Sequence, residues 1–388
     1  MKMNWKKLLV LASLLFCFST GTIAFAEMDY EKMPIAELLQ KAEAGDSDAQ
    51  YWLGISYSDG KGVEKDDGKA FYWFEKSAKL ENPKGQTALA ICYLKGEGVE
   101  KNEKLALEWL RKAIEQKHAK AELLMGTLYQ LGWGVNQSDS EAKIWYEKAA
   151  FQGNRRAQYF VGIYYLGGYE GIEENKEKAL EYLNKSALQG DEIAQYQLGK
   201  CYEEGDGVVR DYQKAKSWYL IVAHQGDSDA QAGLGDIYSK GGYGLEKDYV
   251  EAWQWYQMSA NQKNPRAQYG LGKAYLLGQG VPKNSDQAIV WLERAAGQGD
   301  LKAYGLLGET YLFGENGVVI DYKKARFWLE KAAEKVSYPP YCFYLGKMYE
   351  LGHGGPVDYV KAVKWYQKAA NQGDEESIKA LRKLKTGE

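Results

Sequence analysis

One stretch of sequence occurs nine times along this chain. It begins at Ala49 as AQYWLGISYSDGKGVEKDDGKAFYWFEKSAK, and similar stretches follow at intervals of 36 to 38 residues. A period of this length is typical of stacked helical units, none of which can bury its apolar face alone. The repeat therefore predicts a solenoid rather than a single globular core. The copies begin at Ala49, Gly85, Ala121, Ala157, Ala194, Ala230, Ala267, Ala303 and Tyr341.

Four positions of the repeat hardly vary. Every copy has tyrosine at the position of Tyr57, alanine at the position of Ala70, and tryptophan or tyrosine at the position of Trp73. At the position of Asp66 every copy has Asp, Asn or Ser, which are residues preferred at helix N-caps. Gly60 falls where a left-handed residue would end the preceding helix. Each copy thus predicts two helices joined by a loop.

Each predicted helix carries one stripe of apolar and small residues at helical spacing. The small residues allow two antiparallel backbones to approach, while aromatic rings fill the space between them. The fold class predicted is therefore all-α, a stack of nine helical hairpins. The stripes are Ala49, Leu53, Gly54 and Tyr57 on the first helix, and Ala70, Trp73, Phe74, Ser77 and Ala78 on the second.

The energetics of a single hairpin explain why the copies are many. Ordering about 36 residues costs roughly 50 kcal/mol at ~1.5 kcal/mol per residue. Burying one tryptophan of ~200 Å² returns only ~5 kcal/mol at ~25 cal/mol per Å². A lone hairpin is therefore not expected to fold, and stability should accumulate through the interfaces between neighbours.

The segments outside the repeats are short. We predict an N-terminal capping helix within residues 27–48, from Pro34 to Ala44, and nine repeats over residues 49–377. A lysine-rich closing helix from Glu376 to Lys385 then leads into a tail that ends the segment 378–388. Both terminal helices are expected to act as caps.

The first 26 residues have the composition of a secretory signal peptide. A basic start is followed by an apolar run from Leu8 to Phe18, and Ala24-Phe25-Ala26 fits a small-x-small cleavage site. We therefore expect cleavage after Ala26 and a secreted or periplasmic protein. The alternative is an uncleaved membrane anchor.

Charge and cysteine content exclude several classes of protein. Without residues 1–26 the formal net charge falls from −3 to −6, which argues against nucleic acid as a partner. Cys92, Cys201 and Cys342 lie in different repeats and form no disulfide framework. The three histidines also lie apart, so the sequence predicts no metal site and no cofactor.

Two short motifs look catalytic but fit the repeat better. Gly60-Lys61-Gly62 is not followed by the Lys-Ser/Thr of a phosphate-binding loop, and glycines recur there in nearly every copy. Ser140 and Lys143 have the Ser-x-x-Lys spacing of penicillin-recognising enzymes, yet they stand at the ordinary start of a second helix. Neither motif indicates an enzyme.

The residues of the seventh copy carry a family resemblance. With Ala267-Gln268-Tyr269-Gly270-Leu271-Gly272, then Gly278-Gln279-Gly280-Val281, then Ala288 to Ala296, the chain resembles the Sel-one-like repeat family, a relative of the tetratricopeptide repeat. The resemblance covers about residues 33 to 385. It implies a right-handed α/α superhelical solenoid and an adaptor that assembles protein complexes. Some cysteine-rich members are associated with β-lactam binding, but this chain lacks their paired cysteines.

The same resemblance suggests where a partner would bind. In tetratricopeptide-like solenoids the first helix of each unit lines a concave groove, which here should be more apolar toward the N-terminus and of mixed charge toward the C-terminus. The alternative is that its aromatic residues pack against the neighbouring unit. The expected groove residues are Tyr51, Ile55, Ile91, Tyr159, Ile163, Tyr196, Lys200, Glu203, Asp236, Tyr269, Lys273, Glu309, Phe343 and Lys347.

The leading functional hypothesis is a non-enzymatic scaffold or adaptor outside the cytoplasm that binds a protein or peptide partner in this groove. The alternatives are an envelope hydrolase or β-lactam-binding protein, and a binder of cell-wall fragments. Hydrolysis of nitrocefin would indicate the second class, and sedimentation with isolated cell wall would indicate the third.

Overall fold

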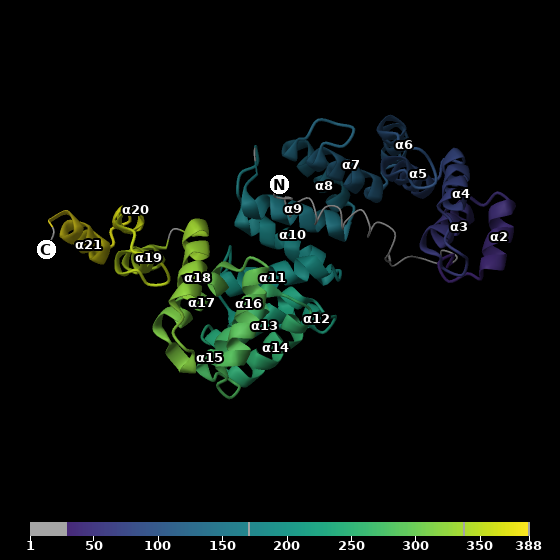
Figure 1. Cartoon of the computed structure of the whole chain (residues 1–388). Coiled ribbons are helices and arrows are strands. Elements are labelled where there is room, and N and C mark those ends of the chain that lie inside the picture. Colours follow the sequence, from purple (N-terminus) through teal and green to yellow (C-terminus); the bar gives the residue numbers. More distant parts are fainter. Residues whose placement is uncertain (1–28, 170, 337, 387–388) are drawn as a thin grey trace. The chain divides into compact units, whose positions relative to one another are not determined.

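A computed structural model describes residues 29–169, 171–336 and 338–386 of the chain. The predicted signal peptide lies outside these residues. Within them every extended regular element is helical, and an isolated bridge between Gly242 and Leu245 is the one β-type pairing (Figure 1). None of the described helices is long and apolar enough to span a membrane. The predicted all-α fold of nine hairpins is confirmed.

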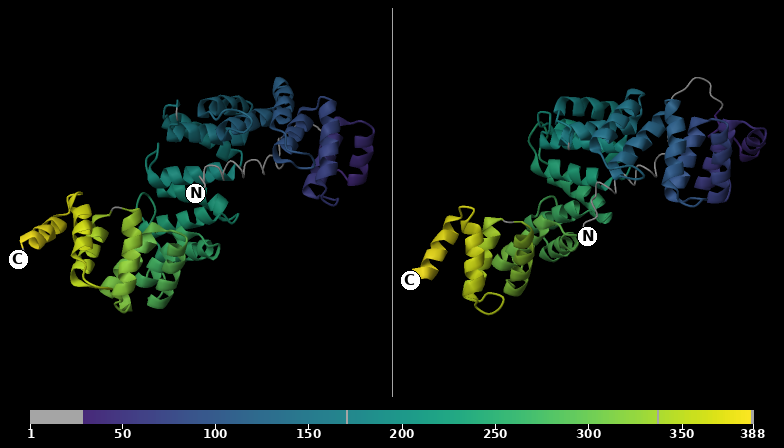
Figure 2. Two further views of the ribbon diagram at one scale, coloured as in Figure 1. Left: turned by 45° about the horizontal axis from the view of Figure 1, so that its top comes forward. Right: turned by 90° about the horizontal axis from the view of Figure 1, so that it is seen from above.

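Helices alternate along the chain as first and second members of the nine hairpins (Figure 2). The first helices are α3 (Ser47–Asp59), α5 (Pro83–Lys95), α7 (Ala119–Leu131), α9 (Arg155–Gly167), α11 (Glu192–Glu204), α13 (Ser228–Lys240), α15 (Pro265–Leu277), α17 (Leu301–Phe313) and α19 (Pro339–Leu351). The second helices are α4 (Asp67–Lys79), α6 (Glu103–Glu115), α8 (Asp139–Phe151), α10 (Lys176–Leu188), α12 (Tyr212–Ala223), α14 (Tyr249–Asn261), α16 (Ser285–Gly297), α18 (Tyr322–Lys335) and α20 (Tyr359–Ala370).

Two further helices flank the hairpins, α2 (Ile35–Glu43) before them and α21 (Glu375–Thr386) after them, and the loop after α17 holds a short 3₁₀ turn, η2 (Glu315–Gly317). The chain divides into two compact units, and the division falls within α11, between Gln195 and Tyr196. Inside each unit, consecutive helices pack on one another in chain order.

Side-chain caps define where the second helices begin. The Asp66 carboxylate accepts a hydrogen bond from the Lys69 backbone N–H, and the predicted Asp/Asn/Ser position does the same in every other copy. These bonds satisfy backbone donors that the first turn of a helix leaves free. Gly60 ends α3 in the left-handed conformation, with φ of 72°.

In eight of the nine hairpins a glycine of the first helix faces a large side chain of the second. A Cβ atom added at Gly54 would lie 2.5 Å from the Phe74 ring, so the first helix approaches the second more closely than any side chain would allow. Alanine replaces glycine at this position in the second hairpin, as Ala90. The pairs in the other hairpins are Gly126–Tyr146, Gly162–Leu183, Gly199–Tyr219, Gly235–Tyr256, Gly272–Leu292, Gly308–Leu329 and Gly346–Tyr366.

Some of these rings also reach the next hairpin. Added Cβ atoms at Gly233 and Gly270, on the following first helices, would meet the rings of Tyr219 and Tyr256 at 2.7 and 2.6 Å. Tyr219 is completely buried. One aromatic ring therefore fixes the distance within a hairpin and the distance to its neighbour.

A ladder of glutamine side chains also links neighbouring hairpins. Gln158 donates to the Ala150 carbonyl at the end of the preceding second helix, and its own amide oxygen accepts from Gln189 of the same hairpin. The pairs Gln262–Gln231 and Gln298–Gln268 repeat the second bond at 2.9 and 2.8 Å. These bonds satisfy buried amides that would otherwise oppose folding.

The two flanking helices carry charged residues where an internal helix would pack. Leu38 of α2 is buried at the position of Phe74, but exposed Glu37 stands at the position of Trp73. Leu381 of α21 is buried, but exposed Arg382 stands at the glycine position. Neither helix can accept a further hairpin without desolvating a charge, so both act as caps.

Two first helices begin without a side-chain cap bond, α7 at His118 and α19 at Tyr338. The Nδ1 atom of His118 lies 2.9 Å from Thr87 Oγ1. Burial, together with the charges of Lys120 and Lys84, lowers the pKa of this imidazole to about 4. The folded chain therefore favours the neutral ring.

The glycine position gives a stability prediction with a matched control. Gly235→Ala places a methyl group against the Tyr256 ring and should lower the free energy of unfolding by about 1–3 kcal/mol. Gly297→Ala, at the end of α16, meets no atom within 4 Å and should leave stability unchanged or raise it by up to ~1 kcal/mol. Urea denaturation followed by circular dichroism measures both. Equal midpoints for the two variants would contradict close packing at Gly235.

His118 predicts a dependence of stability on pH. Because its pKa in the folded state lies below the ordinary value of 6.5, the unfolded chain binds a proton first as the pH falls. Its contribution is complete above pH 6.5 and should decline by about 1–3 kcal/mol between pH 6.5 and 4. In His118→Asn, with the cap residue of Asn82 and Asn154, that decline should shrink in urea titrations across this range. An unchanged pH profile would refute the assignment.

Candidate functional site

Five of the fourteen expected groove residues lie in the interior. Ile55 packs in the core around Phe74, and Ile91 packs in the next core along the chain. The five buried residues pack against neighbouring repeats, which is the alternative stated above, and they expose no surface to a partner. The reason is that first helices of adjacent hairpins, such as α3 and α5, contact each other directly. The five, with relative exposures of 2–6%, are Tyr51, Ile55, Ile91, Tyr159 and Glu203.

The other nine residues keep some exposure. Lys273 and Lys347 are exposed, and neither forms an ion pair with a described residue. The remaining seven are partly buried, namely Ile163, Tyr196, Lys200, Asp236, Tyr269, Glu309 and Phe343. Apart from Ile163, the accessible part of the expected groove therefore lies on the hairpins from α11 onward, which belong to the second compact unit beyond Gln195.

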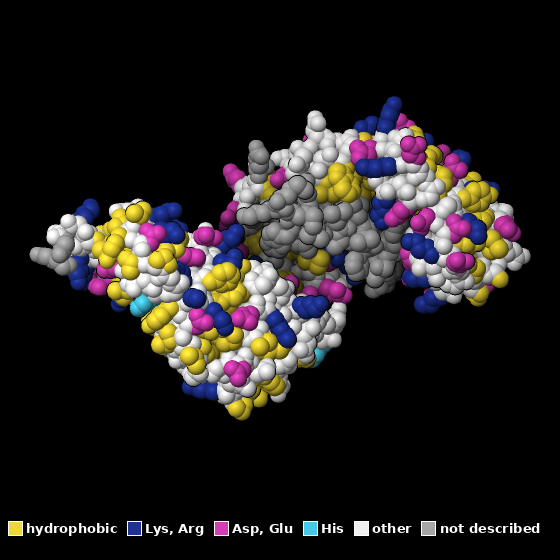
Figure 3. All heavy atoms as spheres, in the orientation of Figure 1, with side chains coloured by type: hydrophobic (Ala, Val, Ile, Leu, Met, Phe, Trp, Pro, Cys, Tyr) yellow, Lys and Arg dark blue, Asp and Glu magenta, His cyan; other side chains and the backbone are white. Residues whose placement is uncertain are grey.

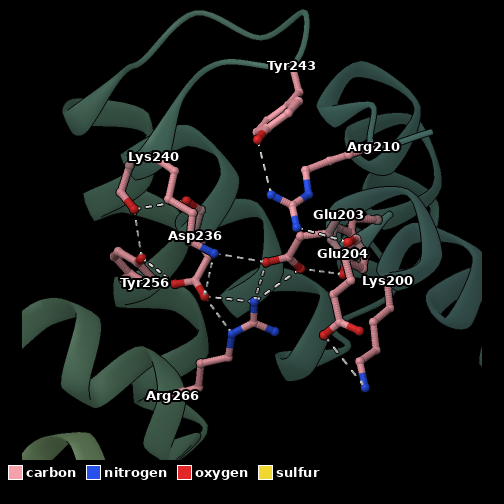
Figure 4. A network of polar contacts seen from close by, with 11 residues as sticks. Lys200, Glu203, Glu204, Arg210, Asp236, Lys240, Tyr243, Tyr256 and Arg266 are labelled. Carbon is pink, nitrogen blue, oxygen red and sulfur yellow. Dashed lines mark hydrogen bonds and ion pairs between the residues drawn. The ribbon is translucent and has the colours of Figure 1, made fainter. Parts of the chain in front are cut away.

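An ion network joins three first helices of this unit (Figure 4). Arg266 at the start of α15 donates to Asp236 of α13 over 2.8 Å and to Glu203 of α11 over 2.9 Å. Lys240 of α13 donates to the same Glu203 carboxylate over 3.2 Å. Two cations thus balance two carboxylates, which is the condition for keeping such charges away from water.

Two buried tyrosines extend the network into the core. Tyr219 donates to Glu203 over 2.8 Å, and Tyr256 donates to Asp236 over 2.5 Å. These are the rings that fill the glycine positions of their hairpins. The network therefore connects the packing of the interior to the surface formed by the first helices.

Arg266 of α15 reaches past α13 to the Glu203 carboxylate of α11. This contact crosses α13 where Ala232 takes the place of the tyrosine found at Tyr196 and Tyr269. We call the surface formed by α11, α13, α15, α17 and α19 the first-helix face.

Burial and charge act against each other within the network. Burial alone would raise the pKa of the Asp236 carboxyl, but Arg266 and Lys240 hold that pKa below its ordinary value. Burial and the Asp236 charge raise the pKa of Tyr256 well above its ordinary value. Both groups therefore keep one protonation state through the neutral range. With a third of its side chain exposed, Arg266 remains accessible to a partner.

A correlation within the repeat could have revealed this site from the sequence. Where the core residue at the position of Phe74 is tyrosine, the position of Ser58 holds a polar partner of its hydroxyl: Gln130 for Tyr146, Glu203 for Tyr219, Ser239 for Tyr256 and Glu350 for Tyr366. Where the core residue is leucine, that position is also leucine, as in Leu94, Leu166, Leu276 and Leu312. Glu203 is thus the partner of a buried hydroxyl, and not a groove residue. Arg266, Lys240, Tyr219 and Tyr256 were not among the residues expected at the site.

The described residues offer no arrangement suited to metal binding: no three His, Cys, Asp or Glu side chains among them lie close enough to hold an ion. The three cysteines in this part of the chain are buried and unpaired. Burial, followed by the charge of Glu97, raises the pKa of Cys92 to about 12, so this thiol stays protonated and unreactive.

The sequence profile of the Sel1 repeat matches the chain nine times, over residues 47–82, 83–118, 119–154, 155–191, 193–227, 228–264, 265–300, 301–337 and 339–374. The chain belongs to the Sel1 repeat family. Each matched segment covers one first helix, its loop and one second helix. Members of this family are generally scaffolds for protein–protein interaction, and the fold is typically non-catalytic.

Two solved structures of Sel1 repeat proteins are similar. One is c5321, a protective antigen present in uropathogenic Escherichia coli strains; it shares 33% identity over 98% of this chain and 82% of its own, with a TM-score of 0.77. The other, from Oxalobacter formigenes, shares 34% identity over 59% of this chain and 99% of its own, with a TM-score of 0.52. Among curated proteins none matches this Sel1 repeat chain.

The network predicts a stability loss at Arg266. Arg266→Met leaves Glu203 and Asp236 buried beside one remaining cation, so the free energy of unfolding should fall by about 3 kcal/mol. Lys200→Met breaks an exposed pair with Glu204, separated by 3.9 Å, and should change it by less than ~0.5 kcal/mol. Chemical denaturation compares the two variants. A loss at Arg266 no larger than that at Lys200 would show that the network does not stabilise the fold.

Proposed function

We propose that this Sel1 repeat protein is a non-enzymatic scaffold that acts outside the cytoplasm and binds a protein or peptide partner through its first-helix face. Sel1 repeat proteins generally bind other proteins, and the proposal assigns this binding to one surface of the chain. The binding region consists of the accessible residues on α15, α17 and α19, with Tyr269, Lys273, Glu309 and Lys347 at its centre.

The observation that carries this proposal is a change in one register position. In the first two hairpins this position is Ile55 and Ile91, which are buried in the core. In the last three hairpins it is Lys273, Glu309 and Lys347. The two lysines are exposed without an ion-pair partner among the described residues. The fold does not require charges there, whereas a binding surface would use them for specificity.

Tyr269 adds an aromatic anchor to this surface. Its ring is partly buried, packs beside the core of the last hairpins, and lies 6.0 Å from the Lys302 ammonium group. Tyrosine at the centre of an interface contributes large contact area at low cost in side-chain entropy. An aromatic centre with surrounding charges is the pattern expected of a binding face.

The placement outside the cytoplasm rests on the composition of residues 1–26, where a basic start precedes an apolar run and a small-x-small site. The likeness to c5321, which is named as a protective antigen, agrees with an exported protein. The absence of an enzymatic role is supported by the network, whose carboxylates and hydroxyls all hold structural partners.

The proposal predicts that charge reversal on this face abolishes partner binding. Lys273→Glu with Lys347→Glu should remove partners recovered from the native cell by crosslinking and mass spectrometry, because the charges that select the partner would then repel it. The control is Lys104→Glu with Arg111→Glu on α6, which makes the same change in net charge at exposed residues of a second helix. Helical circular dichroism should stay the same in both. A partner list unchanged by the first pair but altered by the second would exclude the first-helix face.

A further inference from the structure

A groove of about 450 or 510 Å³ lies where the loop of the fourth or the eighth hairpin passes the second helix of the preceding hairpin. In the first hairpin a pocket of about 410 Å³ at the same register is lined by residues of that hairpin alone. The floor of each includes the invariant tyrosine, here Tyr57, Tyr165 or Tyr311, and one wall is the loop segment just before the second helix. These copies allow a direct comparison within one molecule.

The loop wall differs between the three grooves. In the first hairpin it consists of Val63-Glu64-Lys65, and in the fourth of Ile172-Glu173-Glu174. In the eighth hairpin it consists of Val318-Val319-Ile320. The side chains of Val319 and Ile320 are 83% and 48% exposed. The fold therefore tolerates charges at this wall, and the apolar residues of the eighth hairpin are not needed for packing.

The opposite wall of the eighth groove is formed by α16, where Ile289 and Val290 lie beside Ser285 and Asp286. Val290 is 40% exposed. We call the space between Val290, Val319 and Ile320 the apolar groove. Exposed aliphatic side chains that face one another across a groove are costly in water and favourable in contact with an apolar ligand.

The register of Ile320 changes character along the chain. The first seven hairpins carry a charged or polar residue there, and the last two carry an aliphatic one. Val357 of the ninth hairpin is 51% exposed. Aliphatic residues at the register of Ile320 are thus confined to the last two hairpins, whereas at the register of Val319 the fifth hairpin also carries an exposed valine, Val209. In chain order the residues are Lys65, Lys101, Gln137, Glu174, Arg210, Lys247, Lys283, Ile320 and Val357.

The charged residues that line the apolar groove are Asp286, Asp321 and Lys324. Exposed Lys283 and Lys323 lie next to these residues in the sequence and form no ion pair with a described residue, and Lys283 donates to the Asn316 side chain over 3.5 Å. The carboxylate of Asp321 is engaged as the N-cap of α18, and Asp286 lies in the first turn of α16, where the helix dipole balances it. Residues 318–386 contain 13 Lys and Arg but 8 Asp and Glu, in a chain whose formal net charge is −3. Figure 3 shows hydrophobic and basic side chains intermingled over the C-terminal helices.

We propose that the apolar groove binds a short protein segment that presents a large aliphatic or aromatic side chain flanked by acidic residues. A groove of about 510 Å³ is within the size range of sites that enclose small ligands and side chains. The lysines at its edge complement carboxylates on the partner. A protein segment is favoured over a lipid surface because the aliphatic residues line a groove between two walls.

This site is separate from the first-helix face. It is built from a loop, from second helices and from Tyr311 of α17, and none of its residues belongs to the ion network around Arg266. The site does not depend on the proposed function, so one can fail without the other.

The test uses the full chain and a defined probe. The probe is a seven-residue synthetic peptide with Leu-Phe at its centre and aspartates on both sides, and its binding is measured by isotope-edited nuclear magnetic resonance. We expect a dissociation constant of about 0.1 mM. Val319→Glu with Ile320→Lys should weaken binding at least tenfold. This variant should fold normally, because Val-Glu-Lys-Asp is the sequence of the first hairpin at Val63 to Asp66.

The converse change provides the matched control. Glu173→Val with Glu174→Ile gives the fourth hairpin, whose opposite wall includes Ile144, an apolar loop wall and should add a second binding site for the same peptide. Thermal denaturation followed by circular dichroism verifies that both double variants keep their helices. A peptide with lysines in place of the aspartates should bind at least tenfold more weakly to the unchanged chain.

Several results would overturn the proposal. Failure of the unchanged chain to bind the acidic peptide at millimolar concentration would do so, as would equal binding by Val319→Glu with Ile320→Lys. Vesicles of anionic phospholipid provide the third arm. If they bind the unchanged chain, lose that binding in the groove variant, and the peptide does not compete with them, the surface recognises lipid and not a protein segment.

Discussion

In eight of the nine hairpins a glycine of the first helix lies directly against a bulky side chain of the second. At Gly54 and Phe74 the ring occupies the volume that a methyl group would need. This contact fixes the separation of the two helices, and the rings of Tyr219 and Tyr256 fix the separation of adjacent hairpins as well. Interiors packed at this density transmit small displacements along the stack, because no free volume absorbs them.

Because the residues that fix the fold lie between the helices, the amino acids on the outer surfaces can vary. The fold needs a small residue, a bulky core residue facing it, an alanine and a cap in each hairpin, and these occupy interior or terminal positions. Surface positions such as those of Ile320 and Lys273 carry no such requirement, so their residues change from one hairpin to the next. A repeat protein of this kind can therefore hold different binding surfaces on one regular frame.

Much of the fold could be predicted from the sequence because its determinants are local and recur nine times. The cap at Asp66 and the tight packing at Gly54 each follow from a side chain and its near neighbours. The expected groove was partly wrong because exposure depends on how adjacent first helices approach, and no single repeat encodes that distance. Ile55 and Lys273 share one register yet differ in burial.

The ion network could not be predicted from the sequence for a different reason. Arg266 and Glu203 are 63 residues apart and belong to hairpins that are not adjacent. Features shared by the nine copies are visible when equivalent positions are compared, but the contact between Arg266 and Glu203 occurs in one place only. The one part of the network that the sequence indicates is the pairing of Tyr219 with a polar residue at the position of Ser58. This pairing identifies Glu203 but not the cations that bind it.

The contact between Arg266 and Glu203 also bears on how such chains change length during evolution. Most interfaces in the stack join immediate neighbours, so duplication or loss of one hairpin would leave equivalent surfaces in contact. A hairpin inserted between α11 and α15 would separate the Arg266 guanidinium from the Glu203 carboxylate. Both charges would then be unpaired and only partly hydrated, which is costly. We therefore expect related chains to differ in hairpin number outside this block, with the block itself inherited whole.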